Sequence, residues 1–118
     1  KCASDMQLIG WHSDTEDSAN FFEFLTFTKD AKTGMGQYNC GGYANAEADK
    51  MVMEANTETD PAKRAAILQK VEAMLIDDAA YVPLHWEDLA YGAKKNVDIK
   101  PVVNVMNFPY LGDLVVNK

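Results

Sequence analysis

The chain lacks any apolar stretch long enough to cross a membrane, and its basic residues are few. Its 118 residues include 18 acidic and 11 basic side chains, which gives a formal net charge of −7. A transmembrane helix needs about 20 consecutive apolar residues, whereas the apolar runs here are short and broken by charge. Sequence-independent binding to nucleic acid depends on clustered lysine and arginine. The sequence therefore favours neither a membrane span nor a nucleic-acid partner.

Cysteine and histidine are also scarce, with two of each. A structural zinc site needs four ligands at short local spacings, and neither Cys2 nor Cys40 has a second cysteine or histidine two to four positions away. The two cysteines fit a disulfide, two free thiols or links to chain outside this sequence, and we favour the disulfide. The chain also lacks an initiator methionine and a cleavable signal, so we expect the gene product to start elsewhere.

The length suits one domain or a part of one. The first apolar segment, residues 6–11, has the length of a buried strand and is predicted to end near Trp11. Polar, turn-forming residues follow to about Ser18, where a short helix is expected to begin and to run through residues 21–25. Residues 28–42 contain four glycines and no helical or strand period, which predicts a long loop.

Two amphipathic helices are predicted in the middle of the chain. Asn45 is placed to cap the first helix. Asp60 is placed to cap the second, and Pro61 suits its first position, where a backbone N–H has no helical partner. The two helices are expected to form an antiparallel pair. Their apolar positions follow the 3.6-residue period and are Ala48, Met51, Val52 and Ala55 in the first and Ile67, Leu68, Val71, Met74 and Leu75 in the second.

The remainder of the chain is rich in β-branched and aromatic residues. Its pattern, broken by proline and glycine, predicts two short strands around a turn at residues 87–88. Residues 101–108 and 113–118 are expected to be extended as well. His85 and Trp86 are expected to contribute packing rather than chemistry. Strands that flank a helix pair indicate a mixed α/β or α+β layer fold, and no linker marks an internal domain boundary.

Acidic residues and one histidine gather in residues 12–23, a combination that suits acid–base chemistry or a metal. However, a calcium loop starting at Asp14 would need glycine and glutamate where Ala19 and Leu25 stand. The HExxH and G-x-S-x-G motifs are absent. A solvated acidic loop and a helix pair that serves as an interaction domain are alternatives, as is a small hydrolase or metal-dependent enzyme. The residues that such an enzyme would use are His12, Asp14, Glu16 and Asp17.

Four segments follow one another with a recognisable order and spacing. They are LIGWHSDTEDSANFF, GMGQYNCGGYANAEADKMVMEA, DPAKRAAILQKVEAMLIDDAAYVPLHW and LAYGAKKNV. Together they resemble the C-terminal part of the extracytoplasmic solute-binding receptors of peptide-class ABC transporters. That family pattern runs from Gly-Trp and an acidic loop through N-x-G-x-Y-x-N-P-E-x-D to a D-P-x-K-R helix. The chain departs from it at Ala46, where proline is common, and at Cys40, where a basic or small residue is common.

The resemblance implies both a fold and a function. Members of the family are several times longer and have two lobes that close on a ligand. Residues 1–118 are therefore expected to form a single segment from the C-terminal part of the second lobe. This would be a partial type II periplasmic-binding-protein lobe of the α/β class, with a mixed sheet and an antiparallel helix pair. The implied role is binding without catalysis or a cofactor, in the bacterial periplasm or another extracytoplasmic space. The ligand is expected to be a peptide or another small molecule, which is delivered to the membrane permease of an ABC transporter.

The resemblance also points to ligand-binding residues after the Gly-Trp pair. In peptide-binding members an aspartate there holds the α-ammonium group of the ligand, and by position this residue is Asp14. A buried amine needs such an acceptor, and charge-assisted hydrogen bonds are the stronger kind. Trp11 and His12 are expected to line the pocket beside it. The alternatives are a core aromatic for Trp11 and an exposed polar residue without a specific contact for His12.

The glycine-rich loop offers further candidates. Tyr38, Asn39 and Tyr43 have polar groups that suit the ligand or the lobe interface, and Gly41 and Gly42 allow a sharp turn between them. The alternative is a purely architectural turn that joins the loop to the helix. A segment taken from a larger sheet also has unpaired edges, so self-association of the isolated chain is expected.

Overall fold

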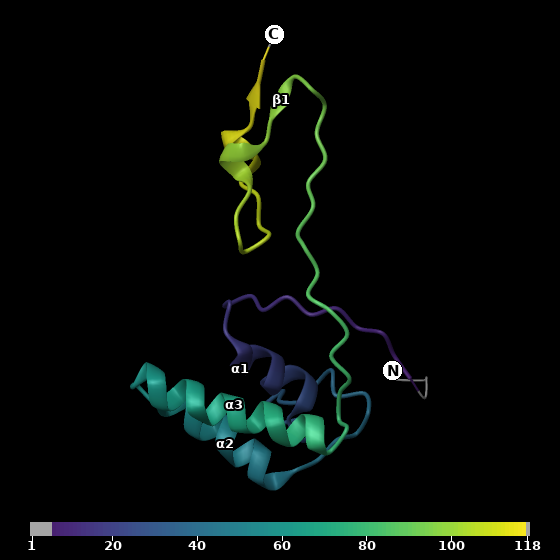
Figure 1. Ribbon diagram of the computed structural model, residues 1–118, viewed down its shortest axis with the longest axis vertical. Helices are drawn as coiled ribbons and strands as arrows, with labels where there is room; N and C mark the ends of the chain where they lie inside the picture. Colours follow the sequence, from purple (N-terminus) through teal and green to yellow (C-terminus); the bar gives the residue numbers. More distant parts are fainter. Residues whose placement is uncertain (1–5, 118) are drawn as a thin grey trace. The chain divides into compact units, whose positions relative to one another are not determined.

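The computed structural model describes residues 6–117. Cys2 lies outside the described residues, and so does its side of the predicted disulfide with Cys40. The chain divides into two compact units, Lys1–Pro83 and Leu84–Lys118. In Figure 1 the first unit contains the longer helices, and the second contains a small sheet and two short turns of 3-10 helix. None of the helices in residues 6–117 combines the length and the apolar character that crossing a membrane requires.

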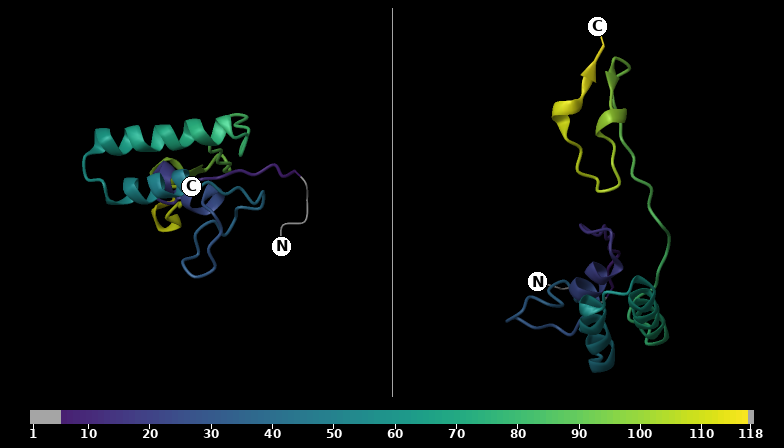
Figure 2. Two further views of the ribbon diagram at one scale, coloured as in Figure 1. Left: turned by 90° about the horizontal axis from the view of Figure 1, so that it is seen from below. Right: turned by 90° about the vertical axis from the view of Figure 1, so that its left-hand side faces the viewer.

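The first unit is built on the two predicted amphipathic helices. Helix α2 spans Ala46–Thr57 and helix α3 spans Pro61–Asp77. A connection of only three residues returns the chain, and the two helices lie side by side as an antiparallel pair (Figure 2). Their facing apolar side chains form the core together with two residues of the preceding helical segment. The buried cluster consists of Ala19, Phe22, Val52, Ala55, Leu68, Val71 and Leu75.

Both long helices begin at the predicted capping residues. Oδ1 of Asn45 accepts hydrogen bonds from the backbone N–H groups of Glu47 and Ala48, at 3.0 and 3.2 Å. Oδ1 of Asp60 does the same for the second helix, and Pro61 stands at its first position. These bonds satisfy N–H groups that the first turn of a helix leaves without partners. The predicted starts of both helices are confirmed.

A short helical segment precedes the pair, and this segment changes from an α-helix to a π-helix along its length. Helix α1 spans Ser18–Phe21 and continues as the π-helix η1, Phe22–Thr26. The wider turn is visible in the bond from Phe27 N–H to Phe22 O, five residues apart, at 2.8 Å. Single π-turns are rare and occur often at functional sites. The predicted helix through residues 21–25 is confirmed, but its π-geometry was not foreseen.

The glycine-rich segment is a loop, as predicted, and it binds the backbone of the π-helix. Gly36 N–H donates to Glu23 O at 2.7 Å, and Tyr38 N–H donates to Phe24 O at 3.0 Å. The Tyr81 hydroxyl donates to Leu25 O at 2.8 Å. These three carbonyl groups lie near the end of the helical segment, where internal partners run out. The loop is therefore fixed by the end of η1.

The second unit contains two short strands. Strand β1 (Val97–Asp98) pairs antiparallel with β2 (Val115–Val116), with Val97 opposite Val116. Two single turns of 3-10 helix lie between them in sequence, at Lys100–Val102 and Leu111–Asp113. The predicted extended character of residues 113–118 is thus confirmed at β2, whereas part of 101–108 is helical.

The strand predicted at residues 6–11 and the two predicted around the turn at residues 87–88 are wrong. Residues 6–11 and 81–94 have no regular secondary structure. Among the described residues no neighbouring strand supplies backbone partners to either segment, and a strand needs such partners to form. The apolar side chains that were expected to be buried are exposed, with Leu8 at 84% and Trp86 at 100% of their full exposure. Trp86 therefore does not pack in a core of the described residues.

The predicted fold class needs a corresponding correction. The antiparallel helix pair is present, but the mixed sheet is not found in residues 6–117. The described part of the chain is mostly helical, with one two-stranded antiparallel sheet. Apolar periodicity over a short run shows that a segment can be buried, and it does not show which partner buries it.

Candidate functional site

The acidic loop predicted to bind a ligand is a closed turn. We call residues 12–16 the Asp14 loop. The Ser13 hydroxyl closes it, since Oγ accepts from Asp17 N–H at 3.0 Å and donates to Asp17 O at 2.9 Å. Glu16 takes a left-handed backbone conformation with φ of 57°. His12, Asp14 and Glu16 are exposed. The turn thus presents two carboxylates outward on a short, hydrogen-bonded frame.

The turn is attached to the helical unit at both ends. On its first side, Trp11 Nε1 donates to Oδ1 of Asn20 at 3.0 Å. On its second side, Asp17 forms a bidentate ion pair with Arg64. Nη1 donates to Oδ2 at 2.6 Å, and Nη2 donates to Oδ1 at 3.0 Å. Oδ1 of Asp17 also caps α1 by accepting from Ala19 N–H at 2.8 Å. Both attachments are half-buried, so water weakens them less than it would on an open surface.

An aromatic cluster stands next to the first attachment. The ring of Trp11 lies 5.8 Å from the ring of Phe24 and 5.8 Å from that of Tyr38, and the last two are 6.2 Å apart. These separations are within the range of favourable aromatic pairs. Trp11 and Phe24 are half-buried and Tyr38 is 50% exposed. Trp11 and Tyr38, both predicted site residues, are thus brought together, and part of the cluster faces outward.

Asn39 and Tyr43, by contrast, use their polar groups within the chain. Asn39 is 5% exposed, and its Nδ2 donates to Phe27 O at 3.0 Å and to Tyr43 O at 2.7 Å. Its Oδ1 accepts from Tyr43 N–H at 3.1 Å. The Tyr43 hydroxyl donates to Oδ2 of Asp78 at 2.6 Å. This geometry supports the architectural alternative for both residues, and it leaves their predicted ligand role as a prediction.

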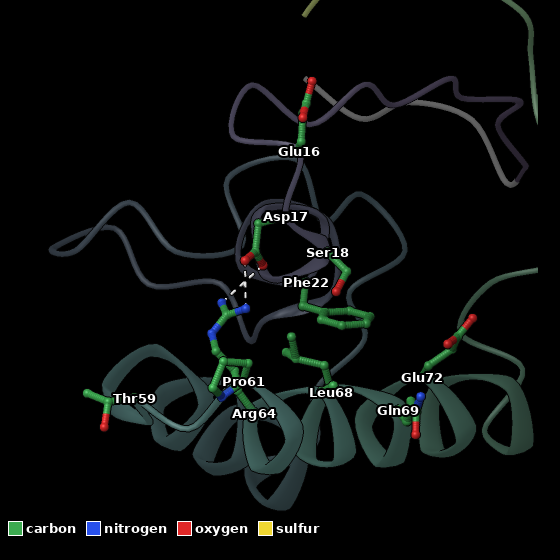
Figure 3. A pocket seen from close by; sticks show the side chains of 11 residues that line it. Glu16, Asp17, Ser18, Phe22, Thr59, Pro61, Arg64, Leu68, Gln69 and Glu72 are labelled. Carbon is green, nitrogen blue, oxygen red and sulfur yellow. Dashed lines mark hydrogen bonds and ion pairs between the residues drawn. The ribbon is translucent and has the colours of Figure 1, made fainter. Parts of the chain in front are cut away.

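Two open hollows flank the ion pair. One of about 440 Å³ lies between Asp17 and helix α3, and its lining includes Phe22, Arg64 and Leu68. Another of about 310 Å³ shares Asp17 and Arg64 with it. Figure 3 shows the guanidinium group of Arg64 reaching from α3 to Asp17, while the Glu16 side chain points away from α3. The cation in these hollows is already neutralised by Asp17.

Hydrogen bonds and burial shift the pKa values of Asp17, Asp78 and Tyr43. The bond from Arg64 is the largest cause that lowers the pKa of Asp17 below 3.8. The bond from Tyr43, followed by that from Asn45, lowers the pKa of Asp78 below 3.8. Burial, followed by the bond to Asp78, raises the pKa of Tyr43 above 10.0. At neutral pH both aspartates are therefore ionised and Tyr43 carries its proton.

The described residues contain no group of three or more histidine, cysteine, aspartate or glutamate side chains that could hold a metal ion. The acidic cluster of residues 12–23 is instead spread out, because Asp17 turns to Arg64 and the Glu23 side chain accepts from Asn56 Nδ2 at 2.5 Å. The cluster does not bring several of its carboxylates to one point.

Sequence reasoning missed three residues of this region, namely Phe24, Arg64 and Asp78. Phe24 belonged to an aromatic run whose buried face could not be assigned without the π-turn. Arg64 lies outside the apolar period of its helix, so its position there indicates only a polar side chain. Its partner lies 47 positions earlier, beyond the reach of local patterns. The usable signal was the D-P-x-K-R motif itself, whose arginine stands at a fixed place in the first turn of the helix.

Comparison with known proteins gives relatives of one kind. The oligopeptide-binding protein OppA of Bacillus subtilis is 33% identical over 78 residues, which are 66% of this chain and 13% of that protein. The probable D,D-dipeptide-binding periplasmic protein DdpA of Escherichia coli is 32% identical over 93 residues, 79% of this chain and 17% of that protein. The probable deoxycholate-binding periplasmic protein YgiS of Escherichia coli is 26% identical over 106 residues, 90% of this chain and 18% of that protein.

The chain thus spans less than a fifth of the length of these curated relatives. No protein-family model and no solved structure matches it. The matches cover most of this short chain and confirm the resemblance identified from its motifs. The chain is homologous to a part of the peptide-binding, solute-binding proteins of ABC transporters.

Proposed function

We propose that the chain is a segment from the C-terminal part of the second lobe of a two-lobed receptor that binds a peptide for uptake by an ABC transporter. In this proposal the Asp14 carboxylate accepts a hydrogen bond from the α-ammonium group of the peptide. Trp11 and Tyr38 contact the apolar part of the peptide. The complete receptor works outside the cytoplasm, and its closed form is recognised by the membrane permease. The chain binds its solute without transforming it.

One observation carries the proposal. The Asp14 loop is fixed at both ends, by Trp11 and Asn20 on one side and by Asp17 and Arg64 on the other, yet the Asp14 side chain remains exposed. A carboxylate held outward on a fixed turn can meet a cationic amine with little loss of conformational entropy. The half-exposed aromatic cluster beside it supplies an apolar surface of the kind that ligand sites use for affinity.

The relatives support the same assignment of ligand class. The names of OppA and DdpA describe binding of oligopeptides and of D,D-dipeptides. The name of YgiS describes binding of deoxycholate, an anionic steroid that has no amine. An exposed aspartate favours the first kind of solute, because a negatively charged ligand would be repelled by Asp14 and by the net charge of the chain. The names of DdpA and YgiS also place those proteins in the periplasm.

The test compares three solutes on the complete gene product. Trialanine, N-acetyl-trialanine and deoxycholate would be titrated by calorimetry into the wild-type protein, Asp14→Asn and Glu16→Gln. We expect trialanine to bind best and Asp14→Asn to weaken it by roughly tenfold or more, since a charge-assisted hydrogen bond is worth about 1.5 to 3 kcal/mol. Glu16→Gln is the matched control, because it removes a neighbouring exposed carboxylate from the same loop.

Several results would contradict the proposal. Equal affinity for trialanine and its N-acetyl form would show that the protein does not recognise the α-ammonium group. An equal loss in Glu16→Gln would reduce the role of Asp14 to general charge attraction. Preferred binding of deoxycholate would assign a different solute class, and hydrolysis of trialanine by the wild-type protein would favour the enzyme alternative.

A further inference from the structure

We infer that Arg64, which lies on helix α3, is a positioning residue that holds the Asp14 loop in its binding geometry. The inference rests on the proposed function, because the loop matters for affinity only if Asp14 meets the ligand. Arg64 is not assigned any contact with the ligand. Its effect passes through Asp17, the residue that directly follows the loop and caps α1.

The contacts of Arg64 tie together three parts of the helical unit. Its two terminal nitrogens donate to the two carboxylate oxygens of Asp17, at 2.6 and 3.0 Å. Its Nε donates to Ala55 O, in the last part of α2, at 3.0 Å. One guanidinium group therefore joins the Asp14 loop, α2 and α3. Figure 3 shows this group between α3 and the end of the loop.

The arrangement requires arginine rather than any cation. Arg64 donates through three different nitrogens in the fixed planar fork of a guanidinium group. A lysine ammonium group at the same place has a single nitrogen and cannot reach two carboxylate oxygens and a carbonyl in the same way. Arg64→Lys would keep the charge and lose the geometry. This distinction separates positioning from simple charge neutralisation.

The internal bonds of the loop connect it to this end. Ser13 closes the turn through two bonds to the backbone of Asp17, so the turn moves with Asp17. Without Arg64, the Asp17 carboxylate can still cap α1 by accepting from Ala19 N–H. The helix would then remain while the tether from the loop to α3 is lost. We therefore expect a local loosening of residues 13–17 rather than unfolding of the helix pair.

The experiment uses the complete gene product with Arg64→Ala and Arg64→Lys. Lys63→Ala is the matched control, because it removes one positive charge from the neighbouring, exposed position of the same helix turn. Amide hydrogen exchange is measured by mass spectrometry for fragments covering residues 13–19 and residues 48–57. Affinity for trialanine is measured by calorimetry on the same samples, with Asp14→Asn alongside.

The inference predicts that Arg64→Ala raises exchange in residues 13–19 by about tenfold and leaves α2 unchanged. Trialanine affinity is expected to fall by about fivefold to tenfold, with Arg64→Lys also clearly weakened and Lys63→Ala like the wild type. Wild-type affinity of Arg64→Lys for trialanine, with fast exchange in Arg64→Ala, would assign charge neutralisation instead and overturn positioning.

Failure of this inference differs from failure of the proposed function. Unchanged exchange in residues 13–19 of Arg64→Ala overturns the inference even if Asp14→Asn abolishes binding. Faster exchange there with unchanged affinity also overturns it, because Arg64 would then only stabilise the fold. The proposed function is overturned if Asp14→Asn binds trialanine normally or if the wild-type protein does not bind it. The claimed effect of Arg64 on affinity is then overturned as well.

Discussion

The hydroxyl group of Tyr43 donates a hydrogen bond of 2.6 Å to Oδ2 of Asp78, which joins the loop before α2 to the residue that ends α3. The same oxygen accepts from Nδ2 of Asn45 at 3.0 Å. Asn45 uses its own Oδ1 to cap α2. One carboxylate thus connects the start of α2 with the end of α3, and this fixes how the antiparallel pair closes.

This relationship predicts how stability changes with pH. The pKa of Asp78 is lowered in the folded protein by the bonds from Tyr43 and Asn45, and that of Asp17 is lowered by the bond from Arg64. A lowered pKa stabilises the fold above the unfolded value, near 3.8, and this contribution is lost as the pH falls through the folded values. We therefore expect the free energy of unfolding to decrease below about pH 4.

Tyr43→Phe should flatten part of that acid dependence. Removal of the hydroxyl takes away the largest cause of the lowered pKa of Asp78, so less stability remains to be lost on acidification. The pKa of Tyr43 itself is raised above 10.0, so its contribution is present below pH 10 and is lost as the pH rises through the folded value. Urea unfolding at pH 7, 4 and 3 would measure the acid dependence.

Tyr110→Phe is the control, since Tyr110 is 72% exposed. The prediction would be contradicted if the free energy of unfolding of the wild type and of Tyr43→Phe changed with pH in parallel.

Asn39→Ala should destabilise the protein by about 3 kcal/mol. The substitution removes two hydrogen bonds to carbonyl groups and one from a backbone N–H, at a buried position. Each buried polar group left without a partner costs about 1 to 3 kcal/mol, and some of them will find water. Urea unfolding checks the value. Gln37→Ala is the control because Gln37 is a nearby exposed amide, and equal losses in the two variants would show that Asn39 has no special structural role.

Gly36→Ala should cost more than Gly34→Ala, although both glycines have positive φ, of +64° and +80°. A Cβ atom at Gly36 would collide with the carbonyl oxygen of Phe27, whereas a Cβ atom at Gly34 would meet nothing within 4 Å. We expect about 3 kcal/mol of destabilisation for Gly36→Ala and about 1 kcal/mol for Gly34→Ala, where only the left-handed backbone is strained. Equal melting temperatures of the two variants would argue against close docking of this loop on η1.

The sequence allowed the long helices to be predicted because their signals are local. Asn45, Asp60 and Pro61 mark the starts within one turn, and the apolar period of 48–55 and 67–75 identifies the buried faces. Residues 6–11 also carry apolar residues in a pattern that suits burial, and they form no strand. A helix makes its backbone hydrogen bonds within itself, whereas a strand depends on a partner that no local pattern reveals.

The candidate site was predictable only in part for a similar reason. The family motif pointed to Trp11 and Asp14, and the glycine-rich loop pointed to Tyr38, without showing that the rings of Trp11 and Tyr38 contact each other and Phe24. The role of Asn39 depends on the carbonyl groups of Phe27 and Tyr43, which residue type alone does not indicate. Side-chain identity therefore suggested what each residue could do, and contacts between distant segments decided what it does.

Tyr38→Ala should weaken binding of an apolar peptide with little effect on stability. Tyr38 is 50% exposed and packs at a tilt against the rings of Trp11 and Phe24, so its ring can cover an apolar ligand side chain while the core of α2 and α3 stays intact. Under the proposed function, trialanine should lose about threefold to tenfold in affinity and trileucine more, because the larger side chain buries more apolar area.

Calorimetry with both peptides on the complete gene product measures this difference, and thermal unfolding shows whether the fold is unchanged. Tyr110→Ala is the control, since Tyr110 is exposed and lies in the other unit. Equal losses for trialanine and trileucine would show that the ring of Tyr38 does not contact the side chains of the ligand. Unchanged affinity for both would place the ring of Tyr38 outside the binding surface and leave His12 and Asp14 as the candidate residues on the Asp14 loop.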